Sequence, residues 1–565
     1  MFFPEKLTCM WLKQAYKNGL KSEELIDEII KRTEMYKDYH IWIVKPTMEI
    51  LKQYFEKLPA DRESLPLWGI PFAVKDNIDV ANMPTTAACP DYSYIPTKNA
   101  FVVEQLIQAG AIPIGKTNLD QFATGLVGTR SPYGEVYNAY QPELISGGSS
   151  SGSAVSVALG MAAFSLGTDT AGSGRVPAML NTLVGLKPAI GSWSTSGVVP
   201  ACASLDCVTV FANNIQEAEL IDTYAKGYDK ECAWSRIFEE KGKILPKKVY
   251  LPMDEPTFYG DFAKQYQEKW NKAVCRIKRL GIKVEYIHYQ MFEKAALILY
   301  EGAYVAERWQ DLKDFIESHP KKIFPVTEKI LRSGGTKEQT ASKLFGNLHE
   351  LQAYKQKTSE LLKDSVMIMP TAGGTFTREQ VRQNPIDTNS QMGLYTNHCN
   401  LLDLMAVAVP ENSTDYNYPF GITVFGRSDN KNLVLSFAEK FLSSETMPIA
   451  VCGLHKKGRA LEYQLTELGA EFEMHTHTSN NYKLYELNTL PVKPGMIRSN
   501  HGETKAIEVD VYTIPKINFG KLMEEVSQPL SIGNIQLEDG RIVKGFLCEN
   551  AGLLDAKDIT QSGKF

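Results

Sequence analysis

The spacing of apolar residues changes along the chain, and each pattern predicts a different kind of element. In the first 60 residues, LKSEELIDEIIKRTEMY places Leu20, Leu25, Ile29 and Ile30 near one face of a helix. From residue 68 onward, short apolar runs read as strands: WGIPFAVKDNIDV at 68–80, AIPIG at 111–115, KVYLP at 248–252 and VMIMP at 366–370. Helical stretches separate these runs. Such alternation predicts an α/β domain.

A second change falls near residues 443–448, after the helical run NLVLSFAEKFL. MPIAVCG reads as a strand, and Leu461, Leu465 and Leu468 recur at i, i+4 and i+7, which predicts a helix. Asp539-Gly540 lies between two apolar runs in NIQLEDGRIVKGFL, a strong hairpin signal. We therefore predict a domain over 1–446 and a small β-rich α+β domain over 447–565.

Composition narrows the class of protein. The 565 residues are 43% hydrophobic and 22% charged, as in ordinary soluble globular proteins. With 61 Lys and Arg against 66 Asp and Glu, the net charge of -5 argues against a nucleic-acid binder and a polybasic membrane anchor. The most apolar glycine-bounded run, 153–167, is shorter than the roughly 20 residues of a membrane span. We therefore expect neither a nucleic-acid nor a membrane partner.

Cysteine and histidine spacing gives little sign of a metal. The nine cysteines are scattered without CxxC spacing, which is typical of reduced thiols and predicts a cytoplasmic protein. His475 and His477 alternate along one predicted strand but have no third ligand. We expect no metal site.

Three segments of the first domain could carry chemistry. Lys75 lies inside an apolar strand pattern, where an unpaired ammonium is costly, although a paired strand lysine is the alternative. ISGGSSSGSAVSVALG at 145–160 runs from a Gly/Ser loop into an apolar helix, and LGTDTAGSGRVPA follows at 166–178. A phosphate-binding loop needs a lysine where Ser153 and Ala154 stand. No GxSxG string is present, and His398 alone among the downstream histidines has an apolar setting, so a histidine-based triad lacks support.

WGIPFAVKDNIDV, GGSSSGSA and GTDTAGSGRVPA resemble, in order and spacing, the three signature blocks of the amidase signature family of serine hydrolases. The resemblance implies a mixed central sheet flanked by helices and a Ser-Ser-Lys triad without a cofactor. Ser173 would be the nucleophile, Ser149 the middle serine after a cis Gly148–Ser149 bond, and Lys75 the base. The main-chain N–H groups of Thr170, Ala171, Gly172 and Ser173 would form the oxyanion hole.

The physics of the residues agrees with these roles. A serine hydroxyl is a weak nucleophile until a nearby base takes its proton. Lysine can do so only when neutral, and burial lowers its pKa toward that state. Lys75 on an apolar strand is placed for such burial.

A wider likeness covers nearly the whole chain. DNIDVANMPTTAACP, KTNLDQFATGLVGTRSPYG, GVVPACASLDCV, LYEGAYVAERWQ and, near the end, VKPGMIR and PLSIGNIQLEDGRIVKGFLCE are similar to the allophanate hydrolase branch of this family. The resemblance implies allophanate (urea-1-carboxylate) as substrate in urea degradation, a functional link to a urea carboxylase and a homodimer built through helices around 260–350. Tyr300 and Arg308 would orient the substrate and bind its carboxylate; the alternative is that Arg308 pairs with a surface carboxylate.

The same resemblance assigns decarboxylation of the product, N-carboxycarbamate, to the second domain. Its GxHxxG-like match is Gly453 to Gly458, with His455 as proton donor and Lys456, Lys457 and Arg459 as a positive field. A loop histidine beside a solvated basic run is the alternative. Two other functions stay open: another amidase of the family, such as an indole-acetamide or glutamyl-tRNA amidase or one acting on a small carboxylated amide, and a non-catalytic binding protein.

Overall fold

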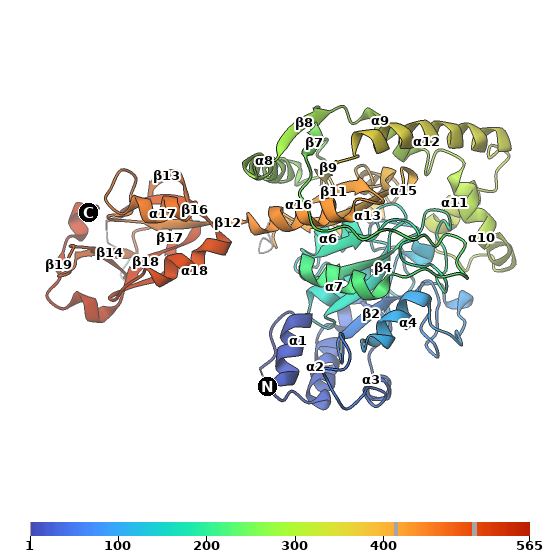
Figure 1. The fold of residues 1–565 in the computed structure, drawn as a ribbon, viewed down its shortest axis with the longest axis horizontal. Coiled ribbons are helices and arrows are strands. Elements are labelled where there is room, and N and C mark those ends of the chain that lie inside the picture. The colour runs from blue at the N-terminus through green and yellow to red at the C-terminus, as the bar shows by residue number, and fades with distance from the viewer. Residues whose placement is uncertain (1, 412–415, 500–504) are drawn as a thin grey trace. The chain divides into compact units, whose positions relative to one another are not determined.

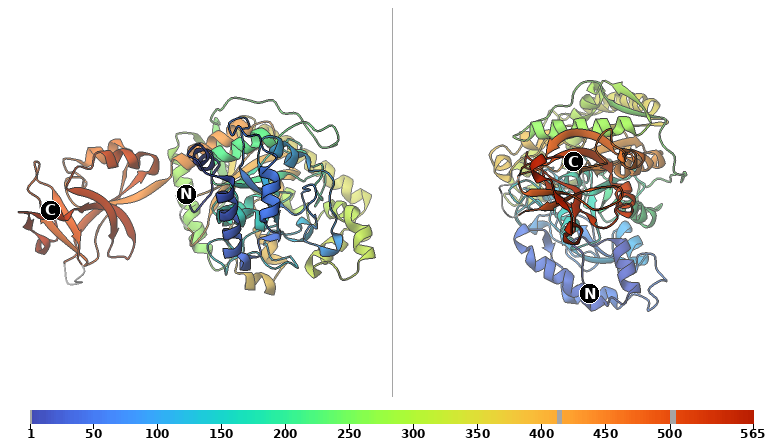
Figure 2. Two further views of the ribbon diagram at one scale, coloured as in Figure 1. Left: turned by 90° about the horizontal axis from the view of Figure 1, so that it is seen from below. Right: turned by 90° about the vertical axis from the view of Figure 1, so that its left-hand side faces the viewer.

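The structure, a computed structural model, describes residues 2–411, 416–499 and 505–565. They fall into two units, Met1–Glu439 and Lys440–Phe565, which we treat separately (Figures 1 and 2). We call them the amidase unit, after the resemblance noted above, and the C-terminal unit.

Among the described residues of the amidase unit, eleven strands form one mixed sheet. Their order is β1-β3-β2-β4-β6-β5-β10-β11-β9-β7-β8. β2 pairs parallel with β3 and β4, whereas β4 pairs antiparallel with β6. The strands are β1 (Trp42–Val44), β2 (Pro71–Lys75), β3 (Ile112–Thr117), β4 (Phe164–Thr168), β5 (Val184–Lys187), β6 (Val208–Ala212), β7 (Lys248–Pro252), β8 (Lys283–Ile287), β9 (Ser365–Pro370), β10 (Leu404–Pro410) and β11 (Gly421–Arg427).

The central strands are buried along their whole length, because helices and loops cover both faces of the sheet. This burial explains why they read as continuous apolar runs in the sequence. The helices are α1 (Cys9–Lys17), α2 (Ser22–Met35), α3 (Met48–Phe55), α4 (Phe101–Gln108), α5 (Ser151–Ala158), α6 (Arg175–Leu180), α7 (Ile215–Ala225), α8 (Ala263–Arg279), α9 (Gln290–Leu297), α10 (Tyr304–Ser318), α11 (Pro325–Ser333), α12 (Ala341–Leu361), α13 (Arg378–Gln383), α14 (Asp387–Met392), α15 (His398–Leu401) and α16 (Lys431–Ser443).

The described residues of the C-terminal unit form two small sheets. Strand order is β13-β16-β12-β18-β17 in one and β15-β14-β19 in the other. Its elements are β12 (Thr446–Val451), α17 (Glu462–Glu467), β13 (Glu471–His477), β14 (Tyr482–Glu486), β15 (Pro494–Arg498), β16 (Glu508–Pro515), α18 (Lys516–Glu524), β17 (Leu530–Gln536), β18 (Ile542–Cys548) and β19 (Lys557–Asp558).

Most elements predicted from the sequence are present. The strands predicted at 68–80, 111–115, 248–252 and 366–370 are β2, β3, β7 and β9, although β2 covers only Pro71–Lys75 of the first run. The predicted hairpin is confirmed: β17 and β18 pair antiparallel from Leu530↔Cys548 to Gln536↔Ile542, and Gly540 has φ +88° in the turn. The helix predicted around Leu465 is α17, which has only six residues.

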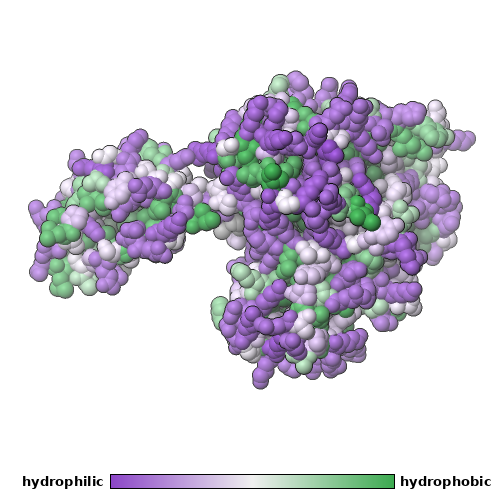
Figure 3. All heavy atoms as spheres, viewed as in Figure 1, coloured by the Kyte–Doolittle hydropathy of each residue, from purple (hydrophilic) through white to green (hydrophobic). Residues whose placement is uncertain are grey.

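No helix among the described residues is both long and apolar enough to cross a membrane. The face of the molecule in Figure 3 is mostly hydrophilic, with small scattered apolar areas.

Candidate functional site

Lys75 ends β2 and is completely buried. Its Nζ donates hydrogen bonds to Ser149 Oγ at 2.8 Å and to Thr168 Oγ1 at 2.6 Å. Burial lowers the pKa of Lys75 to about 7, although the more distant carboxylates of Asp120, Asp206 and Asp169 act in the opposite direction. An amine with this pKa is partly neutral at neutral pH and can accept a proton. The predicted base and middle serine are therefore in direct contact.

Ser149 lies in the loop before α5, and the Gly148–Ser149 peptide bond is cis, as the family resemblance predicted. A side chain at position 148 does not fit, since a Cβ there would come within 2.1 Å of Asp120 Oδ2. Asp120 organises the loop: its main-chain N–H donates to Ser149 O at 3.1 Å, and its Oδ2 accepts from the Gly128 N–H at 3.0 Å. The Gly/Ser string is thus an ordered loop fixed by a buried carboxylate.

Ser173 is 3% exposed and precedes α6. Its hydroxyl donates to Gly125 O at 3.3 Å, while its main-chain oxygen accepts from the Ser150 N–H at 3.4 Å. Within the described residues, no hydrogen bond joins the Ser149 and Ser173 hydroxyls. The two serine loops meet through the main chain, with the Ser173 hydroxyl turned toward Gly125.

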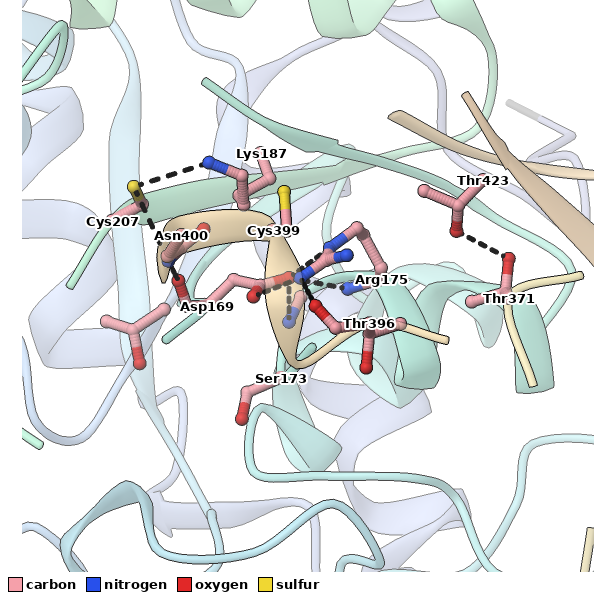
Figure 4. A network of polar contacts seen from close by, with 12 residues as sticks. Asp169, Ser173, Arg175, Lys187, Cys207, Thr371, Thr396, Cys399, Asn400 and Thr423 are labelled. Atoms are coloured by element: carbon pink, nitrogen blue, oxygen red, sulfur yellow. Dashed lines mark hydrogen bonds and ion pairs between the residues drawn. The ribbon is translucent and has the colours of Figure 1, made fainter. Parts of the chain in front are cut away.

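An ion pair between Asp169 and Arg175 holds the loop that carries Ser173. Arg175 donates from Nε and Nη2 to the two Asp169 oxygens, both at 2.9 Å, and Asn400 Nδ2 donates to Asp169 O at 2.7 Å. Burial favours a raised pKa for Asp169, but the Arg175 guanidinium outweighs it and the pKa is lowered. Figure 4 shows the Ser173 side chain pointing away from this ion pair, so the Arg175–Asp169 contact does not occupy its hydroxyl.

The loop between Asp169 and Gly174 presents unused main-chain donors. In the described part of the chain, the N–H groups of Thr170, Ala171, Gly172 and Ser173 donate to no protein acceptor. Gly172 has φ +140°, and a Cβ there would come within 2.3 Å of Thr396 Oγ1. The Thr170 hydroxyl donates to the Asp206 carboxylate. Free N–H groups that are grouped beside a serine form a suitable site for a developing oxyanion.

Tyr300 and Arg308 are brought together, and Arg308 is not a surface residue. Arg308 on α10 is 1% exposed, and its guanidinium lies over the Tyr300 ring at 5.3 Å from the centroid. Arg308 Nη1 donates to Thr124 Oγ1 at 3.3 Å, next to the Gly125 carbonyl that accepts from Ser173. In the described part of the chain, Arg308 makes no ion pair. The alternative of a pair with a surface carboxylate is therefore wrong.

His455 lies in the C-terminal unit and lines a pocket of about 80 Å³ together with Gln464, Lys493, Ser527 and Phe546. Its ring stacks on Phe546 with centroids 5.0 Å apart, and Nε2 is 2.8 Å from Gln464 Oε1. Burial lowers the pKa of His455. The titratable ring of His455 and the side chain of one lysine, Lys493, therefore line the same pocket.

The basic run after His455 does not line this pocket. Lys456 pairs with Glu508, Lys457 Nζ lies 4.2 Å from the centroid of the Phe472 ring, and Arg459 is exposed. The lysine at the pocket is Lys493, whose Nζ donates to Ser527 Oγ at 3.1 Å. The prediction that the 456–459 run supplies the positive field is corrected accordingly.

Other residues singled out in the sequence have partners within the protein. His475 Nδ1 lies 2.6 Å from Asp510 Oδ1, and His477 Nδ1 lies 3.5 Å from Glu538 Oε1. His398 is buried, and its Nδ1 lies 3.1 Å from the Tyr289 hydroxyl. These histidines therefore have structural contacts of their own.

Sequence reasoning missed several residues that position the site: Asp120, Thr124, Thr168 and Asp206. Each is a polar residue with a buried side chain, and each contacts a predicted site residue or its loop. The signal available in the sequence was a polar residue within an otherwise apolar run, as at Thr168 in FSLGT. Only the folded chain identifies the partner.

Comparison with known proteins gives several extended similarities. The chain is 39% identical to urea amidolyase of Saccharomyces cerevisiae over 96% of its own length. That alignment covers 32% of the yeast protein, so the chain spans about a third of the length of the curated relatives it matches. The structure resembles Kluyveromyces lactis allophanate hydrolase with a TM-score of 0.71 and 37% identity, covering 99% of this chain and 98% of that one.

Another similarity covers a smaller share of the chain. A glutamyl-tRNA(Gln) amidotransferase subunit from Thermotoga maritima matches with a TM-score of 0.63 and 25% identity, covering 77% of this chain and 94% of that one. At the family level, the allophanate hydrolase C-terminal domain matches residues 447–565, and the amidase family matches residues 22–435. The chain therefore belongs to the amidase family.

Proposed function

We propose that the protein hydrolyses allophanate to ammonia and N-carboxycarbamate, and that the C-terminal unit then promotes decarboxylation of that product. The observation that carries the proposal is the arrangement around Ser173. A buried lysine contacts the middle serine, and a buried arginine without a carboxylate partner contacts Thr124, the residue before the Gly125 carbonyl that accepts from Ser173. Likeness to the allophanate hydrolase of K. lactis along nearly the whole chain supports the choice of substrate.

The first step forms an acyl-enzyme. Ser173 Oγ attacks the terminal amide carbon while its proton passes to Ser149 Oγ, whose own proton passes to neutral Lys75 Nζ. The hydroxyl of Ser173 must first rotate from Gly125 O toward Ser149, a change of side-chain rotamer. The N–H groups of residues 170–173 stabilise the oxyanion.

Collapse of the resulting tetrahedral adduct runs the relay in reverse and leaves the acyl-enzyme. The amide nitrogen takes a proton from the Lys75–Ser149 pair, the C–N bond breaks and ammonia leaves. Water then attacks the carbonyl carbon of the acyl group and passes a proton to the same pair, which returns that proton to Ser173 Oγ as the C–O bond breaks and N-carboxycarbamate leaves. No cofactor enters this sequence of steps.

Arg308 binds the substrate carboxylate, and the Tyr300 ring packs against its guanidinium. A guanidinium suits a carboxylate because two parallel N–H groups can bind its two oxygens. Burial strengthens this contact, since it removes competing water. A neutral substrate would leave the arginine's charge without a counter-ion, so we propose that the site selects carboxylated amides.

For the second stage we propose His455 as the proton donor. Decarboxylation of N-carboxycarbamate moves an electron pair onto nitrogen, which then takes a proton. An anion beside the ring favours the imidazolium, opposing the lowering of its pKa by burial. Lys493 supplies positive charge to the same pocket.

That the two functions divide between residues 1–446 and 447–565 stays a prediction.

We also propose a homodimer built through helices of the amidase unit. The helices α9 and α12 are neighbours (Figure 1), and both carry exposed apolar side chains: Leu297, Leu344, Phe345 and Leu348. Apolar residues grouped on one surface favour association.

Because curated relatives bear the name urea amidolyase, we further propose a functional link to a urea carboxylase, which would supply the substrate in the cytoplasm.

The proposal is tested by ammonia release from allophanate, malonamate, biuret and urea measured side by side. We expect allophanate to be hydrolysed fastest, malonamate next, and the two neutral compounds at least 100-fold more slowly. The Arg308→Gln variant is the matched control and should lose the preference for the carboxylated compounds. Equal rates with allophanate and biuret would refute carboxylate recognition and favour an amidase of different specificity.

A further inference from the structure

Thr124 lies between two buried arginines. Arg308 Nη1 donates to its hydroxyl oxygen at 3.3 Å, and Arg130 Nη1 donates to its carbonyl oxygen at 2.9 Å. Both arginines are 1% exposed, and neither forms an ion pair with any residue that the structure describes. A buried guanidinium without a carboxylate depends on its remaining hydrogen bonds for position.

The Thr124 hydroxyl has a fixed orientation. It donates to Phe122 O at 3.1 Å, which leaves its lone pairs for Arg308. In the described part of the chain, Thr124 Oγ1 is the one protein acceptor that the Arg308 guanidinium has. The side chain of Thr124 is therefore the group that fixes the direction of this arginine.

The next residue along the chain touches the nucleophile. Gly125 O accepts the hydrogen bond from the Ser173 hydroxyl at 3.3 Å, and Arg130 holds the preceding carbonyl. Arg130 Nη2 also donates to Pro385 O at 2.6 Å, which ties this turn to a distant loop. Two consecutive residues, 124 and 125, thus contact the groups proposed for the two ends of one substrate.

We propose that Thr124 is a positioning residue for carboxylate recognition: its hydroxyl aims Arg308 at the substrate carboxylate, at a distance from Ser173 set by the Thr124–Gly125 turn. The inference rests on the proposed function, since it assumes a carboxylated amide. It adds a residue that touches neither the reacting amide nor the carboxylate and acts through Arg308. The site would thereby select substrates by the distance between their carboxylate and their scissile carbonyl.

Four variants of the chain test this inference: Thr124→Val, Thr124→Ser, Arg308→Gln and the double variant Thr124→Val/Arg308→Gln. Each is assayed for kcat and KM with allophanate and for the rate at which a fluorophosphonate probe labels Ser173. The probe carries no carboxylate, so its rate reports the nucleophile alone. Valine keeps the shape of threonine but removes the acceptor, whereas serine keeps the acceptor.

We expect Thr124→Val to raise the KM for allophanate about 10- to 100-fold, the usual range for losing a hydrogen bond to a charged group. Probe labelling should stay within threefold of wild type, and Thr124→Ser should restore the KM. Because both changes remove one interaction, the double variant Thr124→Val/Arg308→Gln should be no worse than Arg308→Gln alone.

The inference is overturned if Thr124→Val leaves the KM unchanged, if it slows probe labelling as much as allophanate turnover, or if the two losses multiply. The second outcome would mean that Thr124 only maintains the fold around Ser173. A wild-type protein that labels at Ser173 but releases no ammonia from allophanate would instead refute the proposed function, and the inference with it.

Discussion

Replacing Lys75 by methionine should make the amidase unit more stable, and the gain should shrink as the pH rises. Lys75 is completely buried and, among the described residues, forms no ion pair. Its pKa is about 7 in the folded protein against an ordinary value of 10.5. Methionine fills a similar volume without charge.

The size of the effect follows from proton linkage. Below pH 7 the lysine is protonated in both states, and its buried charge destabilises the folded state by about 1.4 kcal/mol per pKa unit, or roughly 5 kcal/mol. Between pH 7 and 10.5 the unfolded chain binds a proton that the folded chain lacks, so the free energy of unfolding of the wild type rises with pH. The advantage of methionine should therefore fall by about 2 kcal/mol between pH 7 and pH 9.

Two hydrogen bonds, to Ser149 and Thr168, are lost in the variant and offset part of the gain, by about 1 to 3 kcal/mol. This offset does not depend on pH, so the change between pH 7 and pH 9 is the cleaner quantity. Urea unfolding followed by tryptophan fluorescence measures it, because all seven tryptophans lie in the amidase unit.

Lys116→Met is the matched control. Lys116 is also buried, but its Nζ lies 3.1 Å from Asp76 Oδ1. Removing it leaves a buried carboxylate without its partner, so this variant should be less stable than wild type. A Lys75→Met variant whose stability difference from wild type does not change between pH 7 and pH 9 would refute the lowered pKa and, with it, Lys75 as the neutral base.

Three further predictions concern the serine site, the His455 pocket and the proposed dimer. The kcat/KM for allophanate should rise about tenfold between pH 6 and pH 8 as Lys75 loses its proton, and a profile that falls over this range would contradict the base assignment. His455→Ala should leave the first equivalent of ammonia unchanged but slow carbon dioxide release 10²- to 10⁴-fold under stopped-flow detection; an unchanged rate would make the C-terminal unit structural. Light scattering should give a dimer for the full chain and a monomer for Phe345→Asp, and a dimeric variant would place the interface elsewhere.

The fold could largely be read from the sequence, because buried strands are apolar along their whole length. β7 matches the predicted run KVYLP residue for residue. The order of strands could not be read, since β2 lies between β3 and β4 through pairings that no local pattern specifies. The three-residue strand β1 was missed, because a segment so short has no periodicity of its own.

The site was predicted through family resemblance rather than through spacing. Lys75 and Ser149 are 74 positions apart in the chain, and only folding brings Nζ to 2.8 Å from Oγ. The resemblance named the reacting groups but not the residues that hold them in place. Thr168 accepts a hydrogen bond from Lys75, and Thr124 accepts one from Arg308. In the C-terminal unit, proximity in sequence misled, because the lysine beside His455 is Lys493, from another loop.

The central claim, that Ser173 is the nucleophile of an allophanate-hydrolysing amidase, is tested most directly by labelling with a fluorophosphonate probe. Mass mapping identifies the labelled peptide, and ammonia release from allophanate is measured on the same samples. We expect the label on Ser173, slower labelling when allophanate is present, and loss of ammonia release in proportion to the labelled fraction. A chain fully labelled at Ser173 that still releases ammonia at the wild-type rate would contradict the account.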